Sequence, residues 1–279
     1  MEKVTKGRIE RANTYLVVPH LDEETRFSYP GQGPGNYQNA GKAVIAERLS
    51  LANGWQTASL LNEVYNSKNP EFKDSKEANF IRQDVMKQKY LWVFNRNLWT
   101  PSNAENAGVY VQYDAQAKGM SEILQVKDLE EALSKSNGGF TENGVRFSQN
   151  GLTAFAPYNT MKAGSHDKGT LANNGFVLAS YGVEGAEKLD NVAKTFPSKP
   201  YVWLVDNTGN NSLQSLSALG RGCAVGGRLD VDGGSGCGSG GYAFGVNDSA
   251  EGKVFKKNKF YLNISPFSLL QKSKSNSSI

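Results

Sequence analysis

The 279-residue sequence contains only two cysteines and two histidines, and it has no long apolar run. Cys223 and Cys237 allow a single disulfide at most, and we expect free thiols because no export signal accompanies them. No stretch approaches the roughly 18 consecutive apolar residues that a membrane-spanning helix requires. Residues 1–11 alternate charges instead of leading into an apolar segment. These absences predict a cytoplasmic protein that does not enter a membrane.

The sequence also lacks the spacings that metal sites and nucleophilic enzymes need. His20 and His166 are far apart and form no zinc-ligand spacing with the cysteines. No Gly-x-Ser-x-Gly motif marks a nucleophilic serine. The segment Asp230-Val231-Asp232-Gly233 starts like a calcium loop, but the next acidic residue is Asp248. The sequence therefore predicts no metal site.

Positive charge is concentrated at the end of the chain. The formal net charge is +4, and residues 251–279 hold six lysines and one acidic residue. Residues 1–250 are left with 25 basic and 26 acidic residues. A nucleic-acid binder usually has a basic face on its folded body, because neutralised phosphates supply most of its affinity. The charge distribution thus argues against nucleic acid and leaves a small molecule or a protein as the expected partner.

Helices are expected to dominate before residue 90. Asn36 stands at the N-cap position of a helix over residues 37–49, where apolar residues recur at helical spacing. A shorter helix is expected over residues 58–65, and a third over residues 75–88 begins with a serine that can cap it. Residues 29–35 are dense enough in proline and glycine to predict a loop.

Strands are expected to interleave with helices after residue 90. Residues 145–148 and 152–155 flank Asn150-Gly151, a dipeptide typical of tight hairpin turns, which need positive φ at both central positions. Residues 176–205 are predicted as a strand, a helix and a strand in that order. Strands are predicted at residues 90–94, 109–113, 176–181, 201–205, 228–231 and 242–246, and helices at residues 128–133, 183–193 and 213–219.

This order of elements predicts an α+β fold, with N-terminal helices followed by a mixed sheet with interleaved helices. Some α/β character is expected within residues 170–250. We expect one globular domain over residues 1–270, with a soft boundary near residues 115–140. The polar, serine-rich residues 271–279 are expected to form a disordered tail.

Glycine is unusually dense in residues 220–245, where it occupies eleven of twenty-six positions. Glycine-rich loops can cradle phosphates with backbone amides. No Lys-Ser or Lys-Thr pair follows these glycines, and a strand rather than a helix is expected after them, so the phosphate-loop motifs are absent. The pattern favours a glycine-rich connection between strands.

The order of a few polar residues resembles that of ADP-ribosyltransferase domains. Arg96 follows an apolar strand, and Ser180 lies in a later predicted strand. The resemblance implies that these residues grip NAD or another nucleotide. It also implies a late catalytic glutamate, but no glutamate lies between Glu187 and Glu251, so Asp230 or Asp232 would have to replace it. The other explanation of Arg96 is an ion pair at the end of a strand.

Aromatic residues gather within residues 92–113. Such a cluster can line a stacking site for bases or sugars, or it can form the core of a sheet. Polar residues interrupt the aromatic run, which makes this segment a candidate ligand site. The predicted ligand-binding residues are Trp92, Asn95, Arg96 and Tyr242.

Residues 91–100, 182–189 and 241–246 together resemble a conserved, uncharacterised family of prokaryotic, largely archaeal proteins. The resemblance extends over most of the chain and implies an intracellular location, but it implies no catalytic residue. The leading functional hypothesis is therefore a ligand-binding or interaction protein of the cytosol. The alternative is a nucleotide-using transferase.

Overall fold

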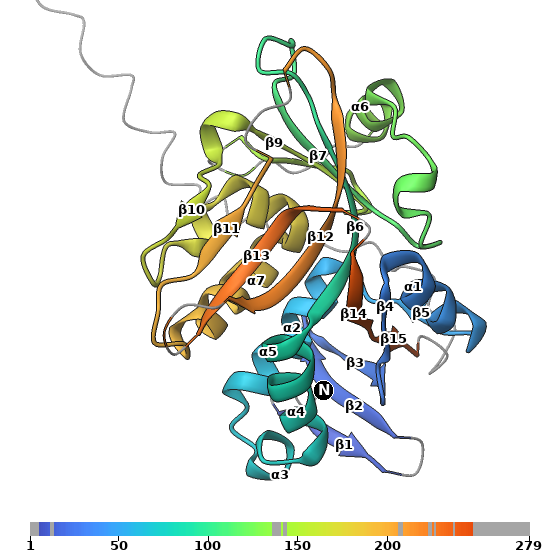
Figure 1. Cartoon of the computed structure of the whole chain (residues 1–279), viewed down its shortest axis with the longest axis vertical. Helices are drawn as coiled ribbons and strands as arrows, with labels where there is room; N and C mark the ends of the chain where they lie inside the picture. The colour runs from blue at the N-terminus through green and yellow to red at the C-terminus, as the bar shows by residue number, and fades with distance from the viewer. Residues whose placement is uncertain are drawn as a thin grey trace, which may run out of the picture.

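The computed structural model of the chain (Figure 1) describes residues 6–11, 14–135, 141, 144–205, 209–222, 225, 227–236 and 238–247. Both cysteines, the lysine-rich segment and the predicted tail at residues 271–279 lie outside the described residues. The described part is an α+β fold, as predicted, with two sheets and helices packed against them.

The larger sheet forms the centre of the molecule. Its central strand, β6 (Tyr90–Trp99), is buried at every position after Tyr90. Neighbouring strands in the order given next are antiparallel, except β11 and β13, which are parallel. The strands run in the order β10 (Gly164–Ser165), β11 (Tyr201–Trp203), β13 (Arg228–Ser235), β12 (Leu213–Gly222), β6 (Tyr90–Trp99), β7 (Gly108–Tyr113), β9 (Thr153–Pro157) and β8 (Arg146–Phe147).

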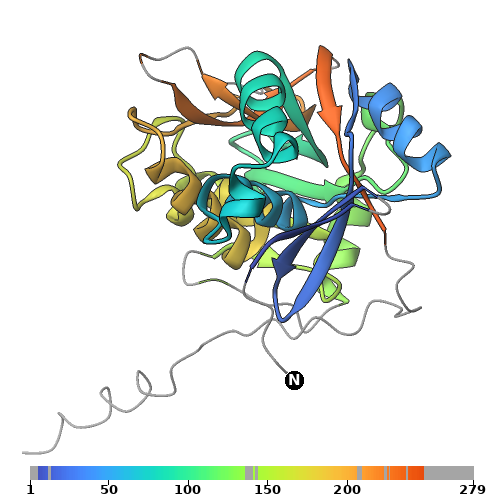
Figure 2. The same ribbon diagram turned by 90° about the horizontal axis from the view of Figure 1, so that it is seen from below.

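The smaller sheet brings the two ends of the described chain together (Figure 2). The C-terminal strand β15 (Gly245–Val246) lies between β3 and β5, while β14 (Ser239–Ala243) joins β4 to β6. The remaining strands are β1 (Arg8–Glu10), β2 (Tyr15–His20), β3 (Glu23–Ser28), β4 (Gln32–Asn36) and β5 (Ser50–Leu51).

Local sequence signals set where the helices begin. The Asn36 side chain accepts a hydrogen bond from the Asn39 amide, and the Ser75 hydroxyl accepts one from the Ala78 amide, as predicted. The α-helices are α1 (Tyr37–Ala46), α2 (Gly54–Asn66), α3 (Pro70–Lys73), α4 (Lys76–Phe80), α5 (Met86–Gln88), α6 (Val126–Ser134) and α7 (Gly175–Lys194). A π-helical turn, Ile81–Val85, joins α4 to α5.

Helices α2 and α7 cover one face of the large sheet, and α1 covers part of the other (Figure 1). The α7 side buries Val93 and Trp99 of β6 in the main core, while Trp92 and Phe94 pack against α1. The division follows from the strand period of two, which sends successive side chains to opposite faces. No described helix covers the outer face of β11 and β13 (Figure 1).

The hairpin is confirmed, since β8 and β9 pair antiparallel and the Ser148 amide donates to the Thr153 carbonyl at 2.8 Å. The predicted tight turn is wrong: Gly151 has a φ of 68°, but φ is not positive at Asn150, and the connection from Phe147 to Thr153 is longer than two residues. The predicted strands at residues 90–94 and 109–113 are β6 and β7, and β6 extends further than predicted.

Residues 176–181 are helical, so the predicted strand and the strand–helix–strand unit are wrong. The Asn174 side chain accepts hydrogen bonds from the Phe176 and Val177 amides and starts α7 there. The segment is apolar on all sides because every residue of it is buried between α2 and the sheet. A short run that is buried on all sides has the same composition in a strand and in a helix.

Three further predictions are corrected by long-range pairing. Residues 213–219, predicted as helix, belong to β12, which pairs with both β6 and β13. Helices do not dominate before residue 90, since four strands precede α1. The predicted loop at residues 29–35 contains part of β4, which among the described strands pairs only with β14 and so tolerates Pro34 at an edge.

Candidate functional site

The structure does not bring the residues predicted for nucleotide transfer together. Asn95 points to the α7 side of β6, where its Nδ2 donates to the Ser180 carbonyl at 3.0 Å. Arg96, the next residue, points to the opposite face. Asp230 and Asp232 lie on β13, separated from β6 by β12. Arg96 and Ser180 therefore do not face a common space.

Arg96 belongs to a buried polar cluster in the interior of β6. Its Nη2 donates to Gln112 at 2.9 Å, its Nη1 donates to the Glu122 carbonyl at 3.3 Å, and its Nε lies 4.0 Å from Asp114. Asp114 is 2% exposed, and it also accepts hydrogen bonds from the Gly119 amide and the Tyr37 hydroxyl. These contacts favour the ion-pair explanation of Arg96, although it lies within the strand and not at its end.

Ser180 and Asn95 line a cavity of about 20 Å³. The cavity lies where α7 bends at Gly182 (φ 67°, ψ 174°) beside the start of α2. Because the helix is interrupted at this bend, the Ser180 carbonyl is available to accept a hydrogen bond from Asn95 Nδ2. A cavity of this size has room for about one water molecule, which is too little for a nucleotide.

Two of the predicted ligand-binding aromatic residues hold the fold together. Trp92 is 2% exposed, and its Nε1 donates to the Gly35 carbonyl at 3.0 Å. Tyr242 packs edge-on against Phe80 with ring centroids 5.5 Å apart. Their contacts tie β6 and β14 to the N-terminal part of the chain, and they account for both residues.

The two predicted aspartates have different surroundings. Asp232 accepts hydrogen bonds from the Gly234 amide at 2.8 Å and the Ser235 hydroxyl at 2.6 Å, and burial raises its pKa. Asp230 instead contacts side chains of its own sheet face, with Arg228 Nε at 2.7 Å and Trp203 Nε1 at 3.1 Å. Asp230, and not Asp232, therefore belongs to the group of aromatic and basic side chains around Trp203.

That group is an aromatic and charged surface that the sequence interpretation missed. We call Tyr201, Trp203, Arg228 and Asp230 the sheet-face patch. The Tyr201 and Trp203 ring centroids are 4.4 Å apart, the Arg228 guanidinium lies 4.2 Å from the centre of the Tyr201 ring, and Trp203 is 45% exposed. The signal that could have found it is the strand period of two: Val202 is buried, so its two aromatic neighbours must face outward.

One glycine of the dense glycine segment, Gly222, makes room for this patch. In the described residues the segment forms strands and not a loop between them. Gly222 on β12 pairs with Arg228, and a Cβ at Gly222 would overlap the Asp230 carboxylate. Glycine at this position lets the carboxylate lie flat on the sheet, where it holds Arg228 and Trp203 in place.

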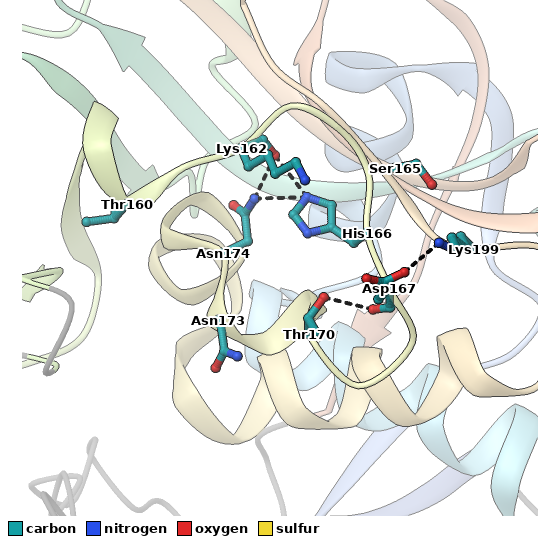
Figure 3. Close-up of a pocket in the computed structure, with 9 residues that line it drawn as sticks. All are labelled: Thr160, Lys162, Ser165, His166, Asp167, Thr170, Asn173, Asn174 and Lys199. Atoms are coloured by element: carbon teal, nitrogen blue, oxygen red, sulfur yellow. Dashed lines mark hydrogen bonds and ion pairs between the residues drawn. The ribbon is translucent and has the colours of Figure 1, made fainter.

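A second candidate is a cavity of about 310 Å³ at the start of α7 (Figure 3). His166, at the end of β10, is 7% exposed, and its Nε2 lies 2.9 Å from the Lys162 carbonyl. Asn174 donates to the same carbonyl at 2.8 Å. Asp167 and Lys199 form an ion pair at 2.5 Å. The lining residues are Thr160, Lys162, Ser165, His166, Asp167, Thr170, Asn173, Asn174 and Lys199.

Within the described ranges, no group of three or more histidine, cysteine, aspartate or glutamate side chains is arranged to hold a metal ion. In the same part of the chain, no helix has the length and apolar character needed to cross a membrane.

The other histidine, His20, is expected to make the stability of the protein depend on pH. Its Nδ1 lies 2.9 Å from the Ser59 hydroxyl, and burial together with the Lys188 ammonium lowers its pKa to about 4, against a smaller opposite effect of Glu184. Because the unfolded-state pKa is higher, about 6.5, protonation favours unfolding, and stability is lost as the pH falls from about 6.5 toward 4. We expect urea denaturation to show a loss of about 2–3 kcal/mol across this range.

His20→Gln is the matched variant, because a neutral amide does not titrate in this range. The variant should lose about 2–3 kcal/mol less stability than the parent between pH 6.5 and 4. Parallel stability curves for the two proteins would contradict the assignment to His20.

The architecture defines an α+β class in which a long mixed sheet carries two helices on one face, while on part of the other face no described helix packs. This chain is similar to a solved structure from work on the accommodation of massive sequence variation in Nanoarchaeota by the C-type lectin fold. The TM-score is 0.51, and the sequences are 12% identical. The similarity covers 76% of this chain and 94% of that one. No family model and no curated protein matches the chain. The likeness is therefore one of fold.

Proposed function

We propose that the protein is a binding protein whose sheet-face patch contacts a protein partner. The observation that carries the proposal is the exposure of Trp203 beside Tyr201 and Arg228 on a face of the sheet that no described helix covers. Tryptophan, tyrosine and arginine are the residue types that most often supply the binding energy of protein interfaces.

The geometry of the patch suits binding because its side chains are held before a partner arrives. Asp230 contacts both Arg228 and Trp203, so little side-chain freedom is left to lose on association. The patch lies on strands of the central sheet, which place side chains more precisely than loops do.

The Nanoarchaeota protein is described as accommodating massive sequence variation by the C-type lectin fold. A fold that accommodates massive sequence variation is a suitable support for a binding site. A cytoplasmic location remains part of the proposal.

The test compares Trp203→Ala with Ile123→Ala, which removes another exposed apolar side chain, 71% exposed. Proteins captured with the full chain are purified, and their affinities for the parent and both variants are measured by calorimetry. Truncating a central interface residue costs about 2 kcal/mol or more, so we expect an affinity loss of about 30-fold for Trp203→Ala. Ile123→Ala should leave the affinity unchanged.

Two outcomes would overturn the proposal. One is a purified partner whose affinity does not respond to Trp203→Ala. The other comes from a glycan array probed in parallel: binding of glycans, with no captured protein that depends on Trp203, would assign the patch to a different ligand class.

A further inference from the structure

We infer that the cavity lined by His166 and Lys162 binds a small carboxylate that also carries a hydroxyl group, such as a sugar acid. The site is separate from the proposed protein-binding patch and does not depend on it. It lies between the loop that follows β9 and the first turn of α7.

The cavity has the size of a small-molecule site, and polar side chains form one of its walls. Its volume of about 310 Å³ is within the range of natural ligand sites, roughly 300–1,000 Å³. Asn174 is 3% exposed, and its side chain is fixed by four contacts. Its Oδ1 accepts from the Phe176 and Val177 amides, and its Nδ2 donates to the Lys162 carbonyl and lies 3.3 Å from His166 Nε2. The wall is therefore rigid before any ligand enters.

The ring contacts of His166 determine which of its nitrogens is available. Nε2 lies 2.9 Å from the Lys162 carbonyl and 3.3 Å from Asn174 Nδ2. The carbonyl can only accept, so the closer contact requires the proton on Nε2, and Asn174 Nδ2 donates to the same carbonyl. In the neutral ring Nδ1 is then an acceptor, and among the described residues no donor contacts it. Figure 3 shows this nitrogen directed toward the space between Asn174 and Thr170. A hydroxyl donor on a ligand would satisfy it.

The charges around the cavity select an anion. Two lysines and one aspartate line it, and Asp167 is held by Lys199 at 2.5 Å. Among the described residues no carboxylate forms a salt bridge with Lys162. A ligand carboxylate that reaches Lys162 would balance the surplus positive charge.

The two requirements together define the ligand class. A simple anion such as phosphate can pair with Lys162, but at neutral pH it is a poor donor to His166. An uncharged sugar can donate to His166 but leaves the lysine charge unbalanced. A hydroxylated carboxylate supplies both groups in one molecule of suitable size.

The experiment uses the side-chain resonances of the two histidines, observed by NMR during titration of the full chain with sodium glucuronate. We expect the His166 signal to shift in a saturable way while His20, on β2, stays unchanged. Lys162→Met should weaken glucuronate binding about tenfold or more, as expected for loss of a charge-assisted hydrogen bond. Lys135→Met removes a lysine that is 72% exposed elsewhere and should leave the affinity unchanged.

Inorganic phosphate and glucose are titrated in parallel. Binding of glucose as tight as that of glucuronate would overturn the carboxylate requirement, and equally tight binding of phosphate would overturn the hydroxyl requirement. An unchanged His166 signal at saturating glucuronate, or equal affinity in Lys162→Met, would overturn the site itself. Since both lysines reach the surface, the variants are expected to fold, and the parent circular dichroism spectrum is the check.

Discussion

Replacing Arg96 with methionine is expected to lower the free energy of unfolding by about 3–5 kcal/mol, the cost of removing one member of a buried ion pair. Methionine fills most of the volume of the arginine stem but leaves the Asp114 carboxylate, 2% exposed, without the nearby guanidinium. The hydrogen bonds from Gly119 and Tyr37 remain, and they do not neutralise the charge. Urea denaturation at neutral pH measures the loss.

Two controls separate this effect from a general disturbance. Lys118→Met removes an exposed ion pair with Glu122, and such pairs contribute about 0–1 kcal/mol. The double variant Arg96→Met with Asp114→Asn should recover part of the lost stability, because the unpaired charge is gone. A normal melting temperature together with lost NAD affinity in Arg96→Met would instead support the transferase hypothesis and contradict the ion-pair role.

Gly54→Ala is expected to cost about 1–3 kcal/mol or more, because it inserts a methyl group into a closed contact between two helices. A Cβ at Gly54, the first residue of α2, would overlap the Ser180 carbonyl oxygen and crowd Asn95 Nδ2. The obstacle is backbone, held in place by the bend at Gly182, so it cannot rotate away. The substitution forces α2 and α7 apart.

Gly236→Ala is the matched control for this substitution. A Cβ at Gly236 meets no atom within 4 Å, and its φ is not in the left-handed region. Thermal and urea denaturation should therefore distinguish the two alanine variants clearly. Equal stability of Gly54→Ala and the parent protein would show that the helices shift at little cost.

The functional surfaces could be predicted only in part. Tyr201 and Trp203 were correctly placed in a strand, but a strand alone does not say which face a helix will cover. The His166 cavity is lined by residues from a loop, from the start of a helix and from the segment before β11. No local sequence pattern therefore predicts it. Arg96 and Ser180 were grouped by their order along the chain, and the alternation of β6 side chains separates them.

The sequence by itself determined what depends on short-range chemistry. The α+β class, the caps at Asn36 and Ser75 and the hairpin around Asn150-Gly151 all follow from interactions between residues a few positions apart. Only the tertiary structure decided that residues 176–181 are helix and residues 213–219 are strand. Both segments are largely buried, and their form depends on partners far away along the chain in β6, such as Asn95 for Ser180 at a separation of 85 residues. Burial on all sides erases the periodicity that distinguishes a helix from a strand.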